Sequence, residues 1–247
     1  MKALKADYCI YPTLLDAFTS YVRADDIYDK YYGWAESPSV TLDEFREKSF
    51  TDLIDRINRK PYESEAASKG TAFNILVDTL AAKKSSDKIK YSLSEDGKMY
   101  HVEYGNYNFF FPAAICRHYA RKFADALHQS FVEGTLATTY GNVRLYGFTD
   151  EITVFAVHDL KTTSKYQVGK YRHNWQHLVY LYCLRDMGVD VDTFIYEVTD
   201  FSAIYTELYH WHKDSFYTLR DGVEDFVRFV NDNRDIITDT KIFGNAE

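Results

Sequence analysis

The stretch "LYGFTDEITVFAVHDLKTTSKY" (residues 145–166) contains two runs rich in apolar and β-branched residues, and an aspartate closes each run. Runs of this kind are typical of β-strands. The first run reaches Asp150, and the second reaches Asp159, which is followed two residues later by Lys161. Because side chains alternate along a strand, Asp159 and Lys161 share one face and Leu160 points to the other. The sequence therefore predicts a paired acid and base at the end of an otherwise apolar strand.

If the two runs pair as an antiparallel hairpin, Asp150 lies opposite Asp159, and directly opposed residues have Cβ atoms roughly 5 Å apart. Two carboxylates at that distance repel each other unless a cation lies between them. Oxygen ligands of this kind suit Mg²⁺ or Mn²⁺, and the backbone carbonyl of Leu160 offers a third oxygen. Beside such an ion, Lys161 can orient or deprotonate a water and balance the charge of a phosphate.

Helical and β-rich segments alternate around this stretch. Apolar spacing and capping signals predict helices over residues 12–60, 63–84, 112–131, 171–188 and 215–237. Strands are predicted over residues 131–140, 143–152, 154–163, 192–201 and 203–212, and a hairpin over 85–111 with its turn at Asp96-Gly97. This order predicts one α/β domain over residues 1–247, with a helical N-terminal region and a central mixed β-sheet that contains an antiparallel meander and is flanked by helices.

The totals are ordinary for a globular protein, with 46% hydrophobic and 27% charged residues in 247. The net charge of -8 argues against a protein that coats nucleic acid non-specifically, but it leaves room for a locally basic cleft. The basic candidates for such a cleft are Arg117, Arg121, Lys122, Lys165, Lys170 and Arg172. Three scattered cysteines, no signal peptide and no apolar run of about 18 residues predict a soluble, cytoplasmic protein.

The opening stretch is part of a series of motifs in a fixed order. A helix carries Gly70, a strand carries Glu133, the next strand has Gly147 and Asp150 in "GFTD", a third strand ends in "DLKT", and a helix carries Gln176 and Tyr180. The series resembles the core of the PD-(D/E)XK nuclease superfamily, in particular its RecB-like branch, which includes phage-type exonucleases. The resemblance spans residues 68–187 and implies a restriction-endonuclease-like core. Two other D-x-K triplets lie in a turn and in a polar tail, so the ordered series carries the specificity.

The resemblance implies a role for each charged residue of the series. Asp150 and Asp159 would bind the metal, Lys161 would be the catalytic lysine, and Glu133 would help to hold a metal or its water. The implied reaction is hydrolysis of DNA phosphodiester bonds with Mg²⁺ or Mn²⁺, in which an activated water attacks phosphorus.

The remaining motif residues are implied to contact the substrate. Gln176 and Tyr180 are four residues apart, which places them on one face of their helix, and Thr162 follows the catalytic lysine. The implied partner is DNA, at double-stranded ends, and the implied role is that of a phage or prophage exonuclease in recombination or repair. A homo-oligomer or a recombination partner protein would be consistent with that role.

One position departs from the family pattern, because Asn74 stands where the family's helix has a histidine. Asparagine can offer an oxygen to a metal, but it is a neutral and weaker ligand, and Asp78, one turn later, could compensate. Two alternatives therefore stay open. The chain could be a nuclease-fold protein that no longer cuts and serves as a DNA- or protein-binding subunit, or a metal-dependent hydrolase of RNA or nucleotides.

Two pairs of histidines, His173 with His177 and His210 with His212, raise the possibility of a zinc site. No third ligand or partner glutamate stands at a recognised spacing from either pair. We therefore expect ordinary surface or core histidines at these positions.

Overall fold

The computed structural model describes residues 5–244. Within them, the main sheet has six strands. Five of these follow the order β1-β6-β7-β8-β9, and the sixth, β5, also pairs with β6. The strands are β1 (Tyr8–Ile10), β5 (Leu127–Thr138), β6 (Gly141–Ile152), β7 (Val157–Thr162), β8 (Thr193–Thr199) and β9 (Ile204–His210). Helices pack against this sheet, so the predicted α/β fold with a central mixed sheet flanked by helices is confirmed.

The meander is also confirmed, because β5, β6 and β7 are antiparallel neighbours. By contrast, β7 and β8 run parallel, and β8 and β9 are antiparallel. Parallel neighbours need a crossover connection, which here contains α6 (Gln176–Asp186). The elements that carry the motif series follow one another as the sequence predicts: helix, three strands and helix.

Seven α-helices and two short 3₁₀ helices lie within the described residues. They are α1 (Pro12–Val22), α2 (Ala24–Tyr31), α3 (Leu42–Ile57), α4 (Glu65–Ala82), α5 (Ala113–Lys122), α6, α7 (Ser215–Asp232), η1 (Arg234–Ile236) and η2 (Thr240–Ile242). The N-terminal region is helical, as predicted over residues 12–60, and it is divided into three helices by breaks at Arg23 and before α3. There, Thr41 and Glu44 each accept a hydrogen bond from the other's backbone N–H, which starts a new helix.

A second, smaller sheet is inserted between α4 and α5. It consists of the antiparallel strands β2 (Lys90–Leu93), β3 (Met99–Tyr104) and β4 (Tyr107–Pro112). The predicted turn at Asp96-Gly97 joins the first two strands, and Gly97 has a φ of 70°, a conformation that favours glycine. A further turn at Gly105, with a φ of 55°, adds the third strand that the predicted hairpin lacked.

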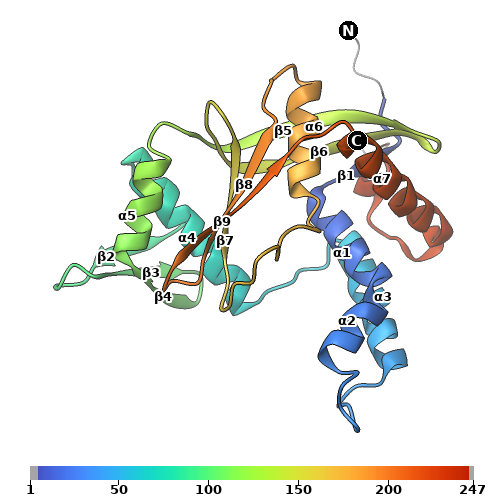
Figure 1. Cartoon of the computed structure of the whole chain (residues 1–247), viewed down its shortest axis with the longest axis horizontal. Coiled ribbons are helices and arrows are strands. Elements are labelled where there is room, and N and C mark those ends of the chain that lie inside the picture. The colour runs from blue at the N-terminus through green and yellow to red at the C-terminus, as the bar shows by residue number, and fades with distance from the viewer. Residues whose placement is uncertain (1–4, 245–247) are drawn as a thin grey trace.

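The apolar side chains form two clusters that meet at β7. The larger cluster joins the main sheet to α1, α3, α6 and α7, and it includes Val157. The second joins α4 and α5 to the small sheet, and it includes Leu160. Figure 1 shows α4, α5 and the small sheet at one end of the main sheet, α7 at the other, and α1–α3 extending away from it. β7 therefore lies between the two apolar clusters.

No helix in the described part of the chain has the length and apolar character that a membrane crossing requires.

Candidate active site

The hairpin of β6 and β7 brings two aspartates together. Its register pairs Glu151 with His158, so the next residues along the two strands are Asp150 and Asp159. Beyond the pair Glu151 and His158, the two strands are joined by a side-chain hydrogen bond. Oδ2 of Asp150 accepts it from the backbone N–H of Leu160 at 2.9 Å. The predicted register of the hairpin is thus confirmed.

Asp159, Lys161 and Gln176 form one closed group. The ammonium of Lys161 lies 2.7 Å from Oδ2 of Asp159 and donates to Oε1 of Gln176 at 2.7 Å. Nε2 of Gln176 in turn donates to Oδ1 of Asp159 at 2.7 Å. Because Gln176 is the first residue of α6, the start of this helix holds the acid and the base of β7 in place.

Asn74 reaches the aspartates from α4. Its Nδ2 donates to Oδ2 of Asp150 at 3.2 Å, whereas its Oδ1 is buried without a hydrogen-bond partner. The helix can come this close because residue 70 is a glycine and has no side chain. A Cβ at this position would lie 3.3 Å from Oγ1 of Thr162, so a larger residue would push the helix away from β7. Gly70, Asn74 and Thr162 therefore belong to one contact between α4 and β7.

Tyr180 is buried on α6 against the backbone of β6. A Cβ on Gly147 would lie 2.7 Å from Cε1 of the Tyr180 ring, closer than real Cβ contacts allow. Burial, and then the charge of Asp159, raise the pKa of Tyr180, so its hydroxyl is protonated at neutral pH. The glycine of "GFTD" is therefore required by the packing of α6 on the sheet.

Gly147→Ala is expected to destabilise the protein by about 1–3 kcal/mol, because the added methyl must displace Tyr180 or α6. Urea unfolding followed by circular dichroism measures the change. Gly70→Ala is the matched control and should cost less, since its new methyl meets one hydroxyl at 3.3 Å. Wild-type stability in Gly147→Ala would show that α6 does not depend on this contact.

The electrostatics of the group follow from burial and from the paired acids. Burial, and next the charge of Asp159, raise the pKa of Asp150 to about 7. Burial acts to lower the pKa of Lys161, but the charges of Asp159 and Asp150 outweigh it and raise that pKa. Lys161 is therefore an ammonium at neutral pH and is suited to balancing negative charge.

The oxygens of this group fit a divalent cation. Oδ1 of Asn74 is a buried acceptor without a donor, and Oδ2 of Asp159 accepts no directed hydrogen bond although Lys161 is near. The N–H and C=O of a strand residue point to the same side, so the Leu160 carbonyl points toward Asp150, as its N–H does. A set of carboxylate, amide and carbonyl oxygens is the donor set that Mg²⁺ and Mn²⁺ take.

Glu133 is not brought into this group. It is exposed on β5 opposite Tyr146, four residues before Asp150 on β6, which corresponds to about 13 Å along the strand. Nε of Arg144 donates to its carboxylate at 2.7 Å. The predicted part of Glu133 in catalysis therefore stays a prediction without a supporting contact.

Asp16 of α1, which is not among the predicted site residues, lies near the group. Its Oδ1 accepts a hydrogen bond from the backbone N–H of Trp175 at 2.7 Å, directly before Gln176. Burial raises the pKa of Asp16 to about 6, while the nearby charge of Lys161 opposes the rise. Asp16 also lines a surface hollow of about 470 Å³ between α1 and α3. No motif marks this residue, because its neighbours in space are about 160 residues away in the chain.

A second cluster of possible metal ligands lies beside the first. Asp78, His128 and Glu151 each offer an atom, and these atoms lie within 4.8 Å of one another, so a divalent ion could bind there. Burial, and next the neighbouring Asp78 carboxyl, raise the pKa of Glu151. Asp78 is thus directed to this cluster and does not compensate for Asn74 in the first one.

The histidines considered for zinc are not part of either cluster. His177 is buried, its ring stacks on Tyr209 with centroids 4.5 Å apart, and its Nδ1 lies 3.3 Å from the hydroxyl of Tyr196. His210 is exposed and contacts Thr193. Within residues 5–244, the group of three His, Cys, Asp or Glu side chains that converges closely enough for a metal is the Asp78 cluster.

The burial of His177 predicts a loss of stability in acid. Burial lowers its pKa to about 4, whereas the unfolded chain has about 6.5, so the unfolded state binds more protons between these values. This stabilisation is complete above pH 6.5 and is lost as the pH falls toward 4. Between pH 7 and 4.5, wild type should lose about 2 kcal/mol more unfolding free energy than His177→Gln. Equal losses in urea titrations at the two pH values would contradict the assignment.

Comparison with known proteins gives only distant matches. No protein-family model matches the chain, and no curated protein matches it closely enough to count as a relative. Among solved structures, SSO0001 aligns at 13% identity and a TM-score of 0.46, over 92% of this chain and 78% of its own. An exonuclease from Eubacterium rectale, so named provisionally, aligns at 14% identity and a TM-score of 0.44, over 76% of this chain and 74% of its own. TM-scores below 0.5 establish neither family nor function, so the functional inference rests on this chain's own residues.

Proposed function

We propose that this protein is a divalent-metal-dependent deoxyribonuclease that hydrolyses phosphodiester bonds. The observation that carries the proposal is the convergence of Asp150, Asp159, Lys161 and Gln176. These residues come from β6, β7 and α6, in the chain order that the resemblance to PD-(D/E)XK nucleases requires. A lone D-x-K triplet is common, whereas a second, partly buried acid and a glutamine that bridges the triplet are specific.

The residues divide the chemistry among them. Asp150, Asp159, the Leu160 carbonyl and Asn74 would hold the ion, which would supply Lewis-acid stabilisation of charge on the phosphate. Lys161, as an ammonium, would balance the charge that develops on the phosphate oxygens. Gln176 holds the side chains of Asp159 and Lys161 in position through its two hydrogen bonds. The ring of Tyr180 packs α6 against β6.

The outer face of β5 and β6 supports nucleic acid as the substrate. Phe131 and Phe148 are 41% and 61% exposed, and their ring centroids lie 5.2 Å apart. Arg144 lies 6.0 Å over the ring of Phe131. Because Phe148 precedes Asp150 by two residues on β6, the two side chains share a face. Exposed rings beside a basic group suit the stacking of unpaired bases at a DNA end.

The loop between β7 and α6 adds positive charge next to Lys161. Lys165, Lys170 and Arg172 are exposed there, as a substrate-contacting group must be. Of the other predicted basic group, Lys122 binds the buried carboxylate of Glu197 instead. The loop is therefore the better candidate for contacting the phosphate backbone.

The finer assignments follow from the resemblance. We propose an exonuclease that acts on double-stranded ends in the cytoplasm, in recombination or repair of phage or prophage type, either as a homo-oligomer or with a partner protein.

The test incubates linear and closed-circular duplex DNA with the purified protein in Mg²⁺ or Mn²⁺, with EDTA and Lys161→Ala as controls. The expected result is loss of the linear DNA alone, abolished by both controls. Cleavage of both DNAs would keep the nuclease and overturn the exonuclease. Cleavage that persists in Lys161→Ala would overturn the site.

A binding subunit is the second candidate, and the neutral Asn74 in place of a histidine favours it. It predicts that neither DNA is cut in either metal while DNA is still retained in a filter-binding assay. Comparing DNA, RNA and nucleotides at equal protein concentration separates both candidates from a hydrolase of RNA or nucleotides.

A further inference from the structure

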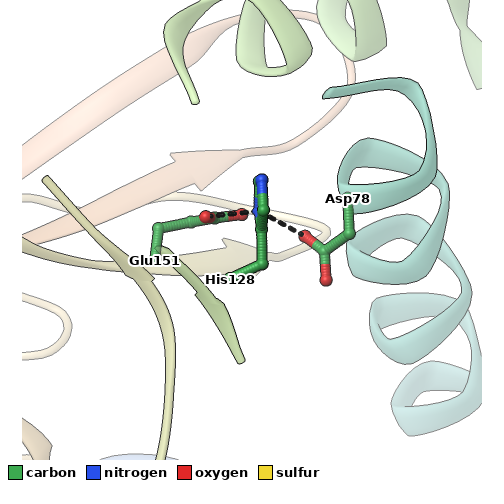
Figure 2. A group of neighbouring side chains, drawn as sticks. All are labelled: Asp78, His128 and Glu151. Carbon is green, nitrogen blue, oxygen red and sulfur yellow. Dashed lines mark ion pairs between the residues drawn. The ribbon is translucent and has the colours of Figure 1, made fainter. Parts of the chain in front are cut away.

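Asp78, His128 and Glu151 converge from three elements, α4, β5 and β6 (Figure 2). Nδ1 of His128 lies 2.7 Å from Oε2 of Glu151 and 3.9 Å from Oδ1 of Asp78. Figure 2 shows the imidazole between the two carboxyl groups, which approach it from opposite sides. We propose that these three residues bind a divalent transition-metal ion at a site distinct from the active site, and that this ion fastens α4 to the β5–β6 ribbon.

Two buried atoms of the cluster have no hydrogen-bond partner. Glu151 is 1% exposed, yet its Oε2 accepts no directed hydrogen bond, and neither does Nδ1 of His128 form one. The 2.7 Å approach between these atoms lacks the angle of a hydrogen bond. A buried carboxylate without a donor is costly, and most such groups in native proteins are paired or coordinate a metal. An ion between the three side chains would satisfy both orphan atoms.

The type of donor atom favours a transition metal. One imidazole nitrogen and two carboxylates form a mixed set, which suits Mn²⁺, Fe²⁺ or Zn²⁺ better than Mg²⁺, since magnesium takes oxygen ligands. A second layer is present as well, because Nε2 of Gln129 donates to Oδ2 of Asp78 at 3.2 Å. Gln129 has a φ of 46°, which is unusual for a residue other than glycine. Such outer partners orient ligating carboxylates.

The cluster is separate from the active site. Asp150 and Glu151 are consecutive on β6, so their side chains leave the strand on opposite faces. The Asp78 cluster shares no residue with the group around Asp159 and Lys161. The two clusters therefore have separate sets of ligands.

The consequence concerns the position of α4. Asn74 precedes Asp78 by one helical turn and contacts Asp150. An ion bound by Asp78, His128 and Glu151 would therefore hold Asn74 against the active site without touching the reacting atoms. The proposal concerns metal binding itself, so it stands whether or not the protein cuts DNA.

The test uses the full chain, freed of metal with EDTA, and Mn²⁺ as the probe. Mn²⁺ electron paramagnetic resonance gives the number of bound ions, and electron spin echo envelope modulation detects a coordinated imidazole ¹⁴N. The active-site ligands are oxygens, so the ¹⁴N signal reports His128 alone. The variants are His128→Gln and Glu151→Gln, and Asp159→Asn is the matched control in the other cluster.

The expected result is a ¹⁴N coupling that His128→Gln abolishes and Asp159→Asn retains, with Mn²⁺ affinity at this site reduced about a hundredfold or more in Glu151→Gln. No ¹⁴N coupling in wild type, or a coupling that survives in His128→Gln, would overturn the proposal. Circular dichroism of metal-free variants checks their folding. Glu151→Gln removes a carboxylate from the side of Asp78, so it should fold at least as stably as wild type without metal.

None of these outcomes depends on DNA cleavage. If the protein proves not to be a nuclease, the ¹⁴N signal still decides the second site, and if the second site is absent, the cleavage assay still decides the first.

Discussion

Asp159→Asn is expected to abolish metal-dependent DNA cleavage, with kcat reduced about a thousandfold or more. The change keeps the shape of the side chain, and the amide can still contact Gln176. It removes the negative charge that faces Lys161 at 2.7 Å and that a divalent ion would require. Single-turnover cleavage of labelled linear DNA measures kcat, and calorimetric titration with Mg²⁺ should show binding lost at the same time.

The chain offers a matched control for this variant. Asp96 starts another D-x-K triplet in the exposed turn between β2 and β3, where its carboxylate accepts a hydrogen bond from the backbone N–H of Lys98. Asp96→Asn should leave kcat within about twofold, because surface substitutions of this kind have small effects. If Asp159→Asn cut DNA as fast as Asp96→Asn, the site would lie elsewhere in the chain.

Lys161→Met is expected to lower kcat about a hundredfold or more and to leave metal binding intact. Methionine keeps most of the side-chain length but removes the ammonium that would balance charge on the phosphate. Mg²⁺ should bind as tightly as in wild type or more tightly, since a cation that competes for Asp159 and Asp150 is gone. Asp159→Asn thus tests metal binding, and Lys161→Met tests catalysis with the metal bound. Cleavage and calorimetry on the same preparations distinguish the two effects.

Lys98→Met, in the exposed turn, controls for loss of one positive charge from the protein. Loss of Mg²⁺ binding in Lys161→Met would contradict the assigned role, because it would mean that Lys161 organises the ligands instead of acting on the phosphate. An unchanged kcat would contradict it as well.

The sequence alone was enough for the parts of the site that depend on local geometry. Asp150 and Asp159 are nine residues apart on two strands joined by a short turn, so pairing follows from strand periodicity, and the register is the predicted one. The shared face of Asp159 and Lys161 follows from the same alternation. Gly147, placed by the motif series, proved to be a position where the ring of Tyr180 leaves no room for a Cβ.

Only the tertiary structure decided where the other acids lie. Glu133 has the strand position that the motif series predicts, but Arg144 on the neighbouring strand binds its carboxylate. Asp78 and His128 are 50 residues apart, and the small sheet and α5 are inserted between them, so no local pattern relates them to Glu151. Asp16 reaches the start of α6 across most of the chain. Backbone periodicity sets which face of a strand or helix a residue occupies, so sequence determined the hairpin, the D-x-K pair and the order of the elements. The packing of α4 and α1 against the sheet depends on contacts between distant segments, so the folded chain alone determined the second cluster and the surroundings of the first.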